Sequence, residues 1–94
     1  MDGRSPYAIR SHWSIGTVTV TNPKSPLAQL FQQYIESASL VSIRYSRSED
    51  ANAVREIVPL RLFKKRGSDM LYVEAHCKKA NDNRVFELSW LSLA

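Results

Sequence analysis

Apolar and polar residues alternate in Val41-Ser42-Ile43-Arg44-Tyr45, the first segment of a region rich in predicted strands. Successive side chains of a strand point to opposite faces of a sheet, so this alternation predicts a half-buried strand over 40–46. The polar run 47–52 predicts a loop. A second strand is expected over 55–63, where Pro59 requires a sheet edge or a β-bulge because proline cannot donate to the ladder.

The same kind of pattern continues to residue 91. Residues 64–69 (KKRGSD) predict a turn, with Gly67 available for a positive φ. A third strand is expected over 70–77, followed by a turn over 79–83 and a last strand over 84–91. The apolar face of the third strand is expected to carry the alternate residues Leu71, Val73, Ala75 and Cys77.

An amphipathic helix is predicted before these strands. Ser25-Pro26 supplies an N-cap hydroxyl and a proline at the first helical position. Glutamines occupy one side of the following segment, which predicts a surface-packed helix over 26–38. The other side is one apolar stripe at helical spacing, formed by Leu27, Leu30, Phe31, Tyr34, Ile35 and Ala38.

The N-terminal part is expected to contain a tail and a strand. Residues 1–13 lack periodicity and predict a flexible tail. Residues 15–21 (IGTVTVT) alternate as in a half-buried or edge strand, which Asn22-Pro23 ends.

One domain over 14–94 is therefore expected, with a strand at 15–21, a helix at 26–38 and a strand meander at 40–91. A helix followed by a meander predicts an α+β fold. Its antiparallel sheet is expected to be strongly bent or closed, and the N-terminal strand could supply a fifth strand.

Composition limits the classes of protein. Ninety-four residues, 44% of them hydrophobic, suit a single globular domain. Cys77 is the only cysteine, so no intramolecular disulfide can form, and the cytoplasm is the expected compartment. Apolar runs are short and the first residues lack a secretory pattern, so no membrane span is expected. The net charge of +4 is compatible with a polyanionic partner or with simple solubility.

Four segments of the meander share their order and spacing with a known family. Residues 41–45 (VSIRY) form an opening strand that ends in an aromatic, and 55–62 (REIVPLRL) hold an arginine, a hydrophobic residue and Pro-Leu. Residues 71–77 (LYVEAHC) stand where the family has Trp-Tyr-Leu, and 84–91 (RVFELSWL) where it has arginine, phenylalanine and leucine, then Asp-Arg-Ile. The chain thus resembles the WYL domain family.

The resemblance implies an Sm-like small barrel of five strands, often preceded by a helix. It also implies a non-enzymatic role in bacterial regulators, in accessory regions of helicases or nucleases, and in defence-associated proteins. There the domain binds nucleic acid or nucleotide-like ligands and helps homodimers to form. No cofactor is expected.

The chain departs from the family at three places. Leu71 replaces the tryptophan, Glu87 replaces a frequent arginine, and Ser89-Trp90 replaces the Asp-Arg pair. The family's arginines at these positions belong to its basic ligand pocket. Either this pocket binds something else or the domain has become an interaction module.

Two residues carried over from the resemblance are candidate ligand contacts. Tyr72 points away from the apolar face and can stack on a base, or it can cover a barrel end. Arg84 can pair with a phosphate through its planar guanidinium, or it is a solvated arginine near Asp82. Arg55 and Arg44 are further candidates for phosphate contacts.

The remaining candidates are a basic turn, a tryptophan and a histidine. Lys64, Lys65 and Arg66 can contact phosphates, or they keep a sheet edge soluble. Trp90 can stack on a ligand, fill the pocket, dock a partner or lie in the core. His76 is included among the candidate ligand contacts.

Catalytic and metal chemistry are not expected. His76 and Cys77 are adjacent in a strand and point to opposite faces, so they cannot form a nucleophile–base pair, and Cys77 is expected to be a buried, inert thiol. His12 adds no zinc-ligand spacing to them. Glu49 and Asp50 are expected to lie in a solvated loop.

Two functions remain open. The first is a ligand-sensing module that binds nucleic acid or a nucleotide-like ligand, as an accessory or sensor domain of a regulator or nucleic-acid-processing system. The second is a protein-interaction or dimerisation module that has lost the basic pocket. Ligand identity, oligomeric state and whether the chain is stand-alone or part of a larger protein are left open.

Overall fold

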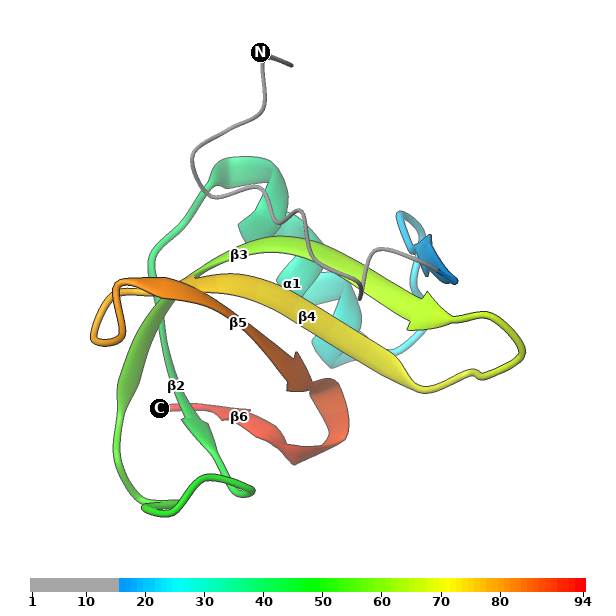
Figure 1. Cartoon of the computed structure of the whole chain (residues 1–94). Coiled ribbons are helices and arrows are strands. Elements are labelled where there is room, and N and C mark those ends of the chain that lie inside the picture. The colour runs from blue at the N-terminus through cyan, green and yellow to red at the C-terminus, as the bar shows by residue number, and fades with distance from the viewer. Residues whose placement is uncertain (1–15) are drawn as a thin grey trace, which may run out of the picture.

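The structure is a computed structural model that describes residues 16–94. The expected tail over 1–13 and the start of the expected first strand lie outside the described residues. Figure 1 shows one helix and a strongly bent antiparallel sheet, so the α+β class is confirmed. The elements are, in order, β1 (Thr17–Thr19), α1 (Pro26–Ser37), β2 (Val41–Tyr45), β3 (Arg55–Lys65), β4 (Leu71–Cys77), β5 (Asp82–Glu87), the 3₁₀ helix η2 (Leu88–Trp90) and β6 (Leu91–Leu93).

Strand β3 is the central strand of the sheet. The strands lie in the order β5-β4-β3-β2-β6, and β1 pairs with β3 beside this path. A bulge between Pro59 and Arg61 shifts the register of β3 against β4. One extra residue reverses the face of the sheet to which each later side chain of the strand points. Ile57 and Pro59 before the bulge and Leu62 after it are therefore all buried on the same face. The expected bulge is thereby confirmed, whereas an edge position is not, because β3 has partners on both sides.

Both ends of helix α1 are set by residues close in the chain. The hydroxyl of Ser25 accepts the backbone N–H of Ala28 at 3.2 Å, and Pro26 is the first helical residue. Ala38 ends the helix in the left-handed region at φ 53°. The expected place of Ala38 in the apolar stripe was therefore wrong, because it is an exposed cap. No helix in the part of the chain that the structure describes is long and apolar enough to cross a membrane.

The core lies between α1 and one face of the sheet, called the inner face below. Phe31 of α1 contributes to the same buried cluster as residues from β2, β3, β4, β5, η2 and β6. The face predicted for β4 is confirmed, with Leu71 partly buried at its end. Full burial of a large apolar side chain stabilises a fold by about 1.5–3 kcal/mol. The cluster comprises Ala28, Phe31, Val41, Ile43, Ile57, Leu62, Val73, Ala75, Cys77, Phe86, Leu88 and Leu91.

The sheet bends toward a barrel but does not close. Within residues 16–94 no ladder joins β5 to β6, and β1 lies off the main path. Side chains cover part of the gap: the Tyr45 ring packs edge-on against Phe86 at 5.0 Å, and its hydroxyl accepts the backbone N–H of Glu87 at 3.1 Å. The expectation of a closed barrel of about five strands was therefore wrong, since the sheet has six strands and open ends.

The predicted single strand over 84–91 was also wrong. The chain forms β5, one turn of 3₁₀ helix and then β6, which pairs with β2. Leu88 and Leu91 are both buried, whereas Trp90 between them is 41% exposed. Burial at a spacing of three residues fits a 3₁₀ turn and not the alternation of a strand.

A polar cluster on the outer face of the sheet joins β1 to β3 and β4. Glu74 is only 5% exposed, and its Oε1 lies 3.6 Å from Nη1 of Arg61. The same guanidinium donates to the hydroxyls of Thr17 at 2.6 Å and Thr19 at 2.9 Å. Burial raises the pKa of Glu74 above its ordinary value, and the charge of Arg61 opposes this shift.

The raised pKa of Glu74 makes the stability depend on pH. Between the ordinary value of 4.5 and the raised value, the folded chain binds more protons than the unfolded chain. The free energy of unfolding therefore falls as pH rises through this window. We expect Glu74→Gln to remove this decline, as measured by denaturant unfolding from about pH 4 to about pH 7. Parallel pH profiles for the two proteins would contradict the assignment.

Candidate ligand-binding site

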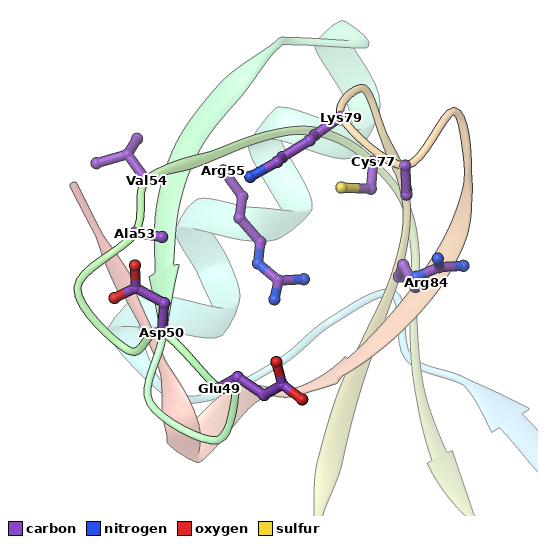
Figure 2. Close-up of a pocket in the computed structure, with 9 residues that line it drawn as sticks. Glu49, Asp50, Ala53, Val54, Arg55, Cys77, Lys79 and Arg84 are labelled. Carbon is purple, nitrogen blue, oxygen red and sulfur yellow. The ribbon is translucent and has the colours of Figure 1, made fainter.

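An open pocket lies where the bent sheet ends between the β2–β3 loop (residues 46–54) and the β4–β5 turn (residues 78–81), as Figure 2 shows. We call it the mouth pocket. Its volume of about 550 Å³ falls within the range of small-molecule sites, roughly 300–1,000 Å³. It is lined by Glu49, Asp50, Ala53, Val54, Arg55, Cys77, Lys79, Ala80 and Arg84.

Strand register places two of the predicted arginines at this pocket. Arg55 lies opposite Ile43, and Arg84 lies opposite Ala75. Residues that face each other across a ladder share a face, and both Ile43 and Ala75 are buried on the inner face. The two arginines therefore continue the inner face beyond the end of the apolar core, where Cys77 is the last buried residue of β4.

The guanidinium of Arg55 extends into the mouth pocket (Figure 2). Among residues 16–94 it forms no hydrogen bond or ion pair. The residue is half-buried, so its position is held by β3 while its five donors stay available. A planar, permanently charged group in this setting is suited to a phosphate or carboxylate.

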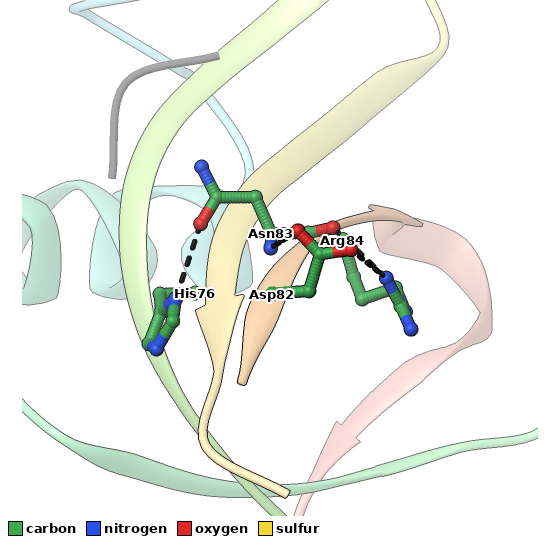
Figure 3. A network of polar contacts seen from close by, with 4 residues as sticks. All are labelled: His76, Asp82, Asn83 and Arg84. Atoms are coloured by element: carbon green, nitrogen blue, oxygen red, sulfur yellow. Dashed lines mark hydrogen bonds and ion pairs between the residues drawn. The ribbon is translucent and has the colours of Figure 1, made fainter. Parts of the chain in front are cut away.

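Arg84 is already paired. Its Nη1 lies 2.9 Å from Oδ2 of Asp82, and its side chain is 45% exposed (Figure 3). The backbone N–H of Asn83 and the guanidinium of Arg84 both hold the pKa of Asp82 below its usual value. A ligand must compete with Asp82 for Arg84, whereas it need not displace any partner from Arg55.

Tyr72 and His76 lie on the outer face, away from the mouth pocket. Tyr72 stacks on its cross-strand partner Phe63, with ring centroids 5.4 Å apart, and Nζ of Lys65 lies 5.2 Å from the tyrosine ring. Nδ1 of His76 lies 3.2 Å from Oδ1 of Asn83 (Figure 3). The structure therefore does not bring Tyr72 and Arg84 into one site.

Three further candidate cations also lie outside the mouth pocket. Arg44 is exposed on β2, and its Nε donates to the backbone carbonyl of Asn52 at 3.2 Å. Lys64 is at the end of β3 opposite Val18 of β1, and Arg66 follows in the turn to β4. The basic turn is thus at the other end of β3 from Arg55.

Trp90 is neither in the core nor in the mouth pocket. The guanidinium of Arg47 lies 4.9 Å from its ring centroid, and the indole is 41% exposed. Glu87 lies opposite Tyr72 on the outer face, and the hydroxyl of Ser89 donates to its carboxylate at 2.6 Å. The three residues at which the sequence departs from the family's basic pocket therefore do not line the mouth pocket.

Glu49 and Lys79 line the mouth pocket but were not predicted as ligand contacts. Both are exposed residues of connecting segments, and Glu49 was expected to be part of a solvated loop. Figure 2 shows the carboxylate of Glu49 turned toward the pocket from the side opposite Arg55. Only the path of the loop over the strand ends brings these charges to the pocket.

The comparisons with known proteins agree with this fold. The family model of the WYL domain matches residues 26–94. The chain belongs to the WYL domain family. The match begins at α1, so the helix is part of the WYL domain and β1 precedes it.

One solved structure with a similar fold is Proteasome accessory factor B/C (PafBC) of Arthrobacter aurescens. It has a TM-score of 0.58 and 26% sequence identity, and the match covers 80% of this chain. The same match covers only 13% of the PafBC chain, so the WYL domain described here corresponds to a small part of that protein. No curated protein sequence matches this chain.

The thiol of Cys77 tests the closure of the core beneath the mouth pocket. Cys77 is only 2% exposed although it lines the pocket. We expect it to react with a thiol reagent such as DTNB at least about tenfold more slowly in the native protein than in denaturant, because the reaction requires local opening. Cys77→Ser combined with Ser46→Cys, which moves the thiol to an exposed position, is the control. Equally fast native labelling of both thiols would contradict a closed pocket floor.

Proposed function

We propose that this WYL domain is a non-enzymatic ligand-sensing module that binds nucleic acid or a nucleotide-like ligand in the mouth pocket. The observation that carries the proposal is the unpaired guanidinium of Arg55 on the inner face. The module would serve as an accessory or sensor domain within a regulator or a nucleic-acid-processing system.

Three features support this proposal. Arg55, Lys79 and Arg84 put positive charge on the mouth pocket, and the whole chain carries a net charge of +4. The pocket is open to solvent, so a nucleic-acid strand or a free nucleotide can enter it. Membership of the WYL family agrees with a regulatory, ligand-binding role.

Replacement of Arg55 tests the proposal. We expect Arg55→Gln to weaken binding of a labelled single-stranded oligonucleotide or a nucleotide by about tenfold or more, because a charge-assisted hydrogen bond is lost. Fluorescence anisotropy at several salt concentrations measures the affinity, and the slope of log K against log salt should fall by about one.

Arg66→Gln is the matched control, since it removes the same group from the basic turn. It should leave the affinity nearly unchanged. Loss of binding in Arg66→Gln but not in Arg55→Gln would move the site to the turn and contradict the mouth pocket.

The exposed indole of Trp90 favours a second candidate function, a protein-interaction or dimerisation module. Trp90 and Leu93 are both about 40% exposed, close to β6 at one end of the sheet. An exposed tryptophan is a typical anchor of a protein interface.

Sedimentation velocity over a range of protein concentrations tests this second function. A self-associating chain should shift toward monomer when Trp90→Ala removes the anchor. Leu40→Ala, at another exposed apolar residue, should not cause this shift. A strictly monomeric wild-type chain would argue against dimerisation.

A further inference from the structure

The mouth pocket is lined by charges of both signs. On the acidic side, Oδ1 of Asp50 accepts the backbone N–H of Asn52 at 3.2 Å within its own loop. The carboxylate of Glu49 has no hydrogen bond or ion pair within residues 16–94. On the basic side, Arg84 is held by Asp82, whereas Arg55 is unpaired. The carboxylate of Glu49 and the guanidinium of Arg55 thus line one pocket without forming an ion pair with each other.

The two side chains approach the pocket from opposite sides (Figure 2). No ion pair joins them, which places their charged atoms more than 4.0 Å apart. Local hydrogen bonds stabilise the loop that carries Glu49. The hydroxyl of Ser48 donates to the backbone carbonyls of Tyr45 at 2.8 Å and Asp50 at 3.0 Å. The fold therefore places Glu49 beside the pocket.

A ligand that fills this space must carry hydrogen-bond acceptors at one end and hydrogen-bond donors at the other. A guanidinium only donates hydrogen bonds, so Arg55 requires an anionic or acceptor group. An ionised carboxylate only accepts, so Glu49 requires donors. A nucleotide satisfies both requirements when its phosphate meets Arg55 and its base presents N–H groups to Glu49.

Among the common bases, guanine matches a carboxylate best. Its ring N–H and exocyclic amino group are adjacent, so both carboxylate oxygens can each accept one bond. Adenine and cytosine offer one amino group beside an acceptor nitrogen, and uracil flanks its single N–H with two carbonyl oxygens that repel a carboxylate. Bidentate pairing of this kind is a strong basis for discrimination between bases.

We infer that Glu49 determines specificity in the mouth pocket and that the ligand class is a guanine nucleotide, with its base edge at Glu49 and its phosphate at Arg55. The inference rests on the proposed function, because it uses the same pocket. It goes further by assigning a role to a loop acid and by choosing one base among four.

Calorimetric titration of the 94-residue chain with GMP, AMP, CMP and UMP tests the inference. GMP should bind roughly 5- to 100-fold more tightly than the other three. Glu49→Gln keeps the size of the side chain but replaces one acceptor oxygen by a donor, so it should abolish the preference for GMP while changing the affinity for UMP little.

Glu36→Gln is the matched control. Glu36 is an exposed carboxylate on α1, where it accepts from Gln32 at 3.2 Å, and the same net charge is removed there. This variant should keep the preference for GMP. If it loses the preference as Glu49→Gln does, a general effect of charge is responsible and the role of Glu49 is overturned.

The remaining outcomes separate the inference from the proposed function. Equal affinity for all four nucleotides would overturn the inference and leave the mouth pocket as a nucleotide site. A preference for GMP that persists in Glu49→Gln would overturn the role of Glu49. Absence of binding by every nucleotide, together with unchanged oligonucleotide binding in Arg55→Gln, would overturn both.

Discussion

The arrangement of this domain depends on the β-bulge that follows Pro59 in β3. Without the extra residue, the strand would place Ile57 and Leu62 on opposite faces, and one of them would lie outside the core. The bulge keeps both on the inner face and increases the local bend and twist. As a result, the first part of β3 pairs with β2, the last part pairs with β1, and β4 follows the strand on both sides of the bulge.

The bend also explains why a polar pocket adjoins an apolar core. The inner face of β3 runs from Leu62 through Ile57 to Arg55, from full burial to half-burial. The same face of β5 changes from the buried Phe86 to the exposed Arg84 and Asp82 toward the turn, whereas β4 stays buried as far as Cys77. The buried core ends there, and five of the nine residues that line the mouth pocket are charged. A solvated guanidinium can occupy such a boundary because its stem packs on apolar atoms while its charge reaches water.

The residues carried over from the resemblance to WYL domains lie on both faces of the sheet. Arg55 and Arg84 are on the inner side, whereas Tyr72 is on the outer face, stacked on Phe63. The substitutions that remove the family's usual positive charges, such as Glu87, lie outside the mouth pocket. Their effect on the charge of the pocket is therefore indirect. The local charge is decided by Arg55 and Arg84 on the strands, together with the charged residues of the two connecting segments.

Local patterns in the sequence were enough to predict the α+β class, the start of the helix, the inner face of β4, the turn at Gly67 and the resemblance to WYL domains. Each of these rests on periodicity or on residues close in the chain. Local patterns could not determine that the sheet stays open or that the segment after Glu87 becomes a 3₁₀ turn, because both depend on where β6 must meet β2. The candidate site followed the same division. The sequence supplied Arg55 and Arg84 as cations, but strand register and loop path decided that they share a pocket with Glu49 while Tyr72 does not. Facing across a ladder is a long-range property, which the β2–β3 register sets for Arg55 and the β4–β5 register sets for Arg84.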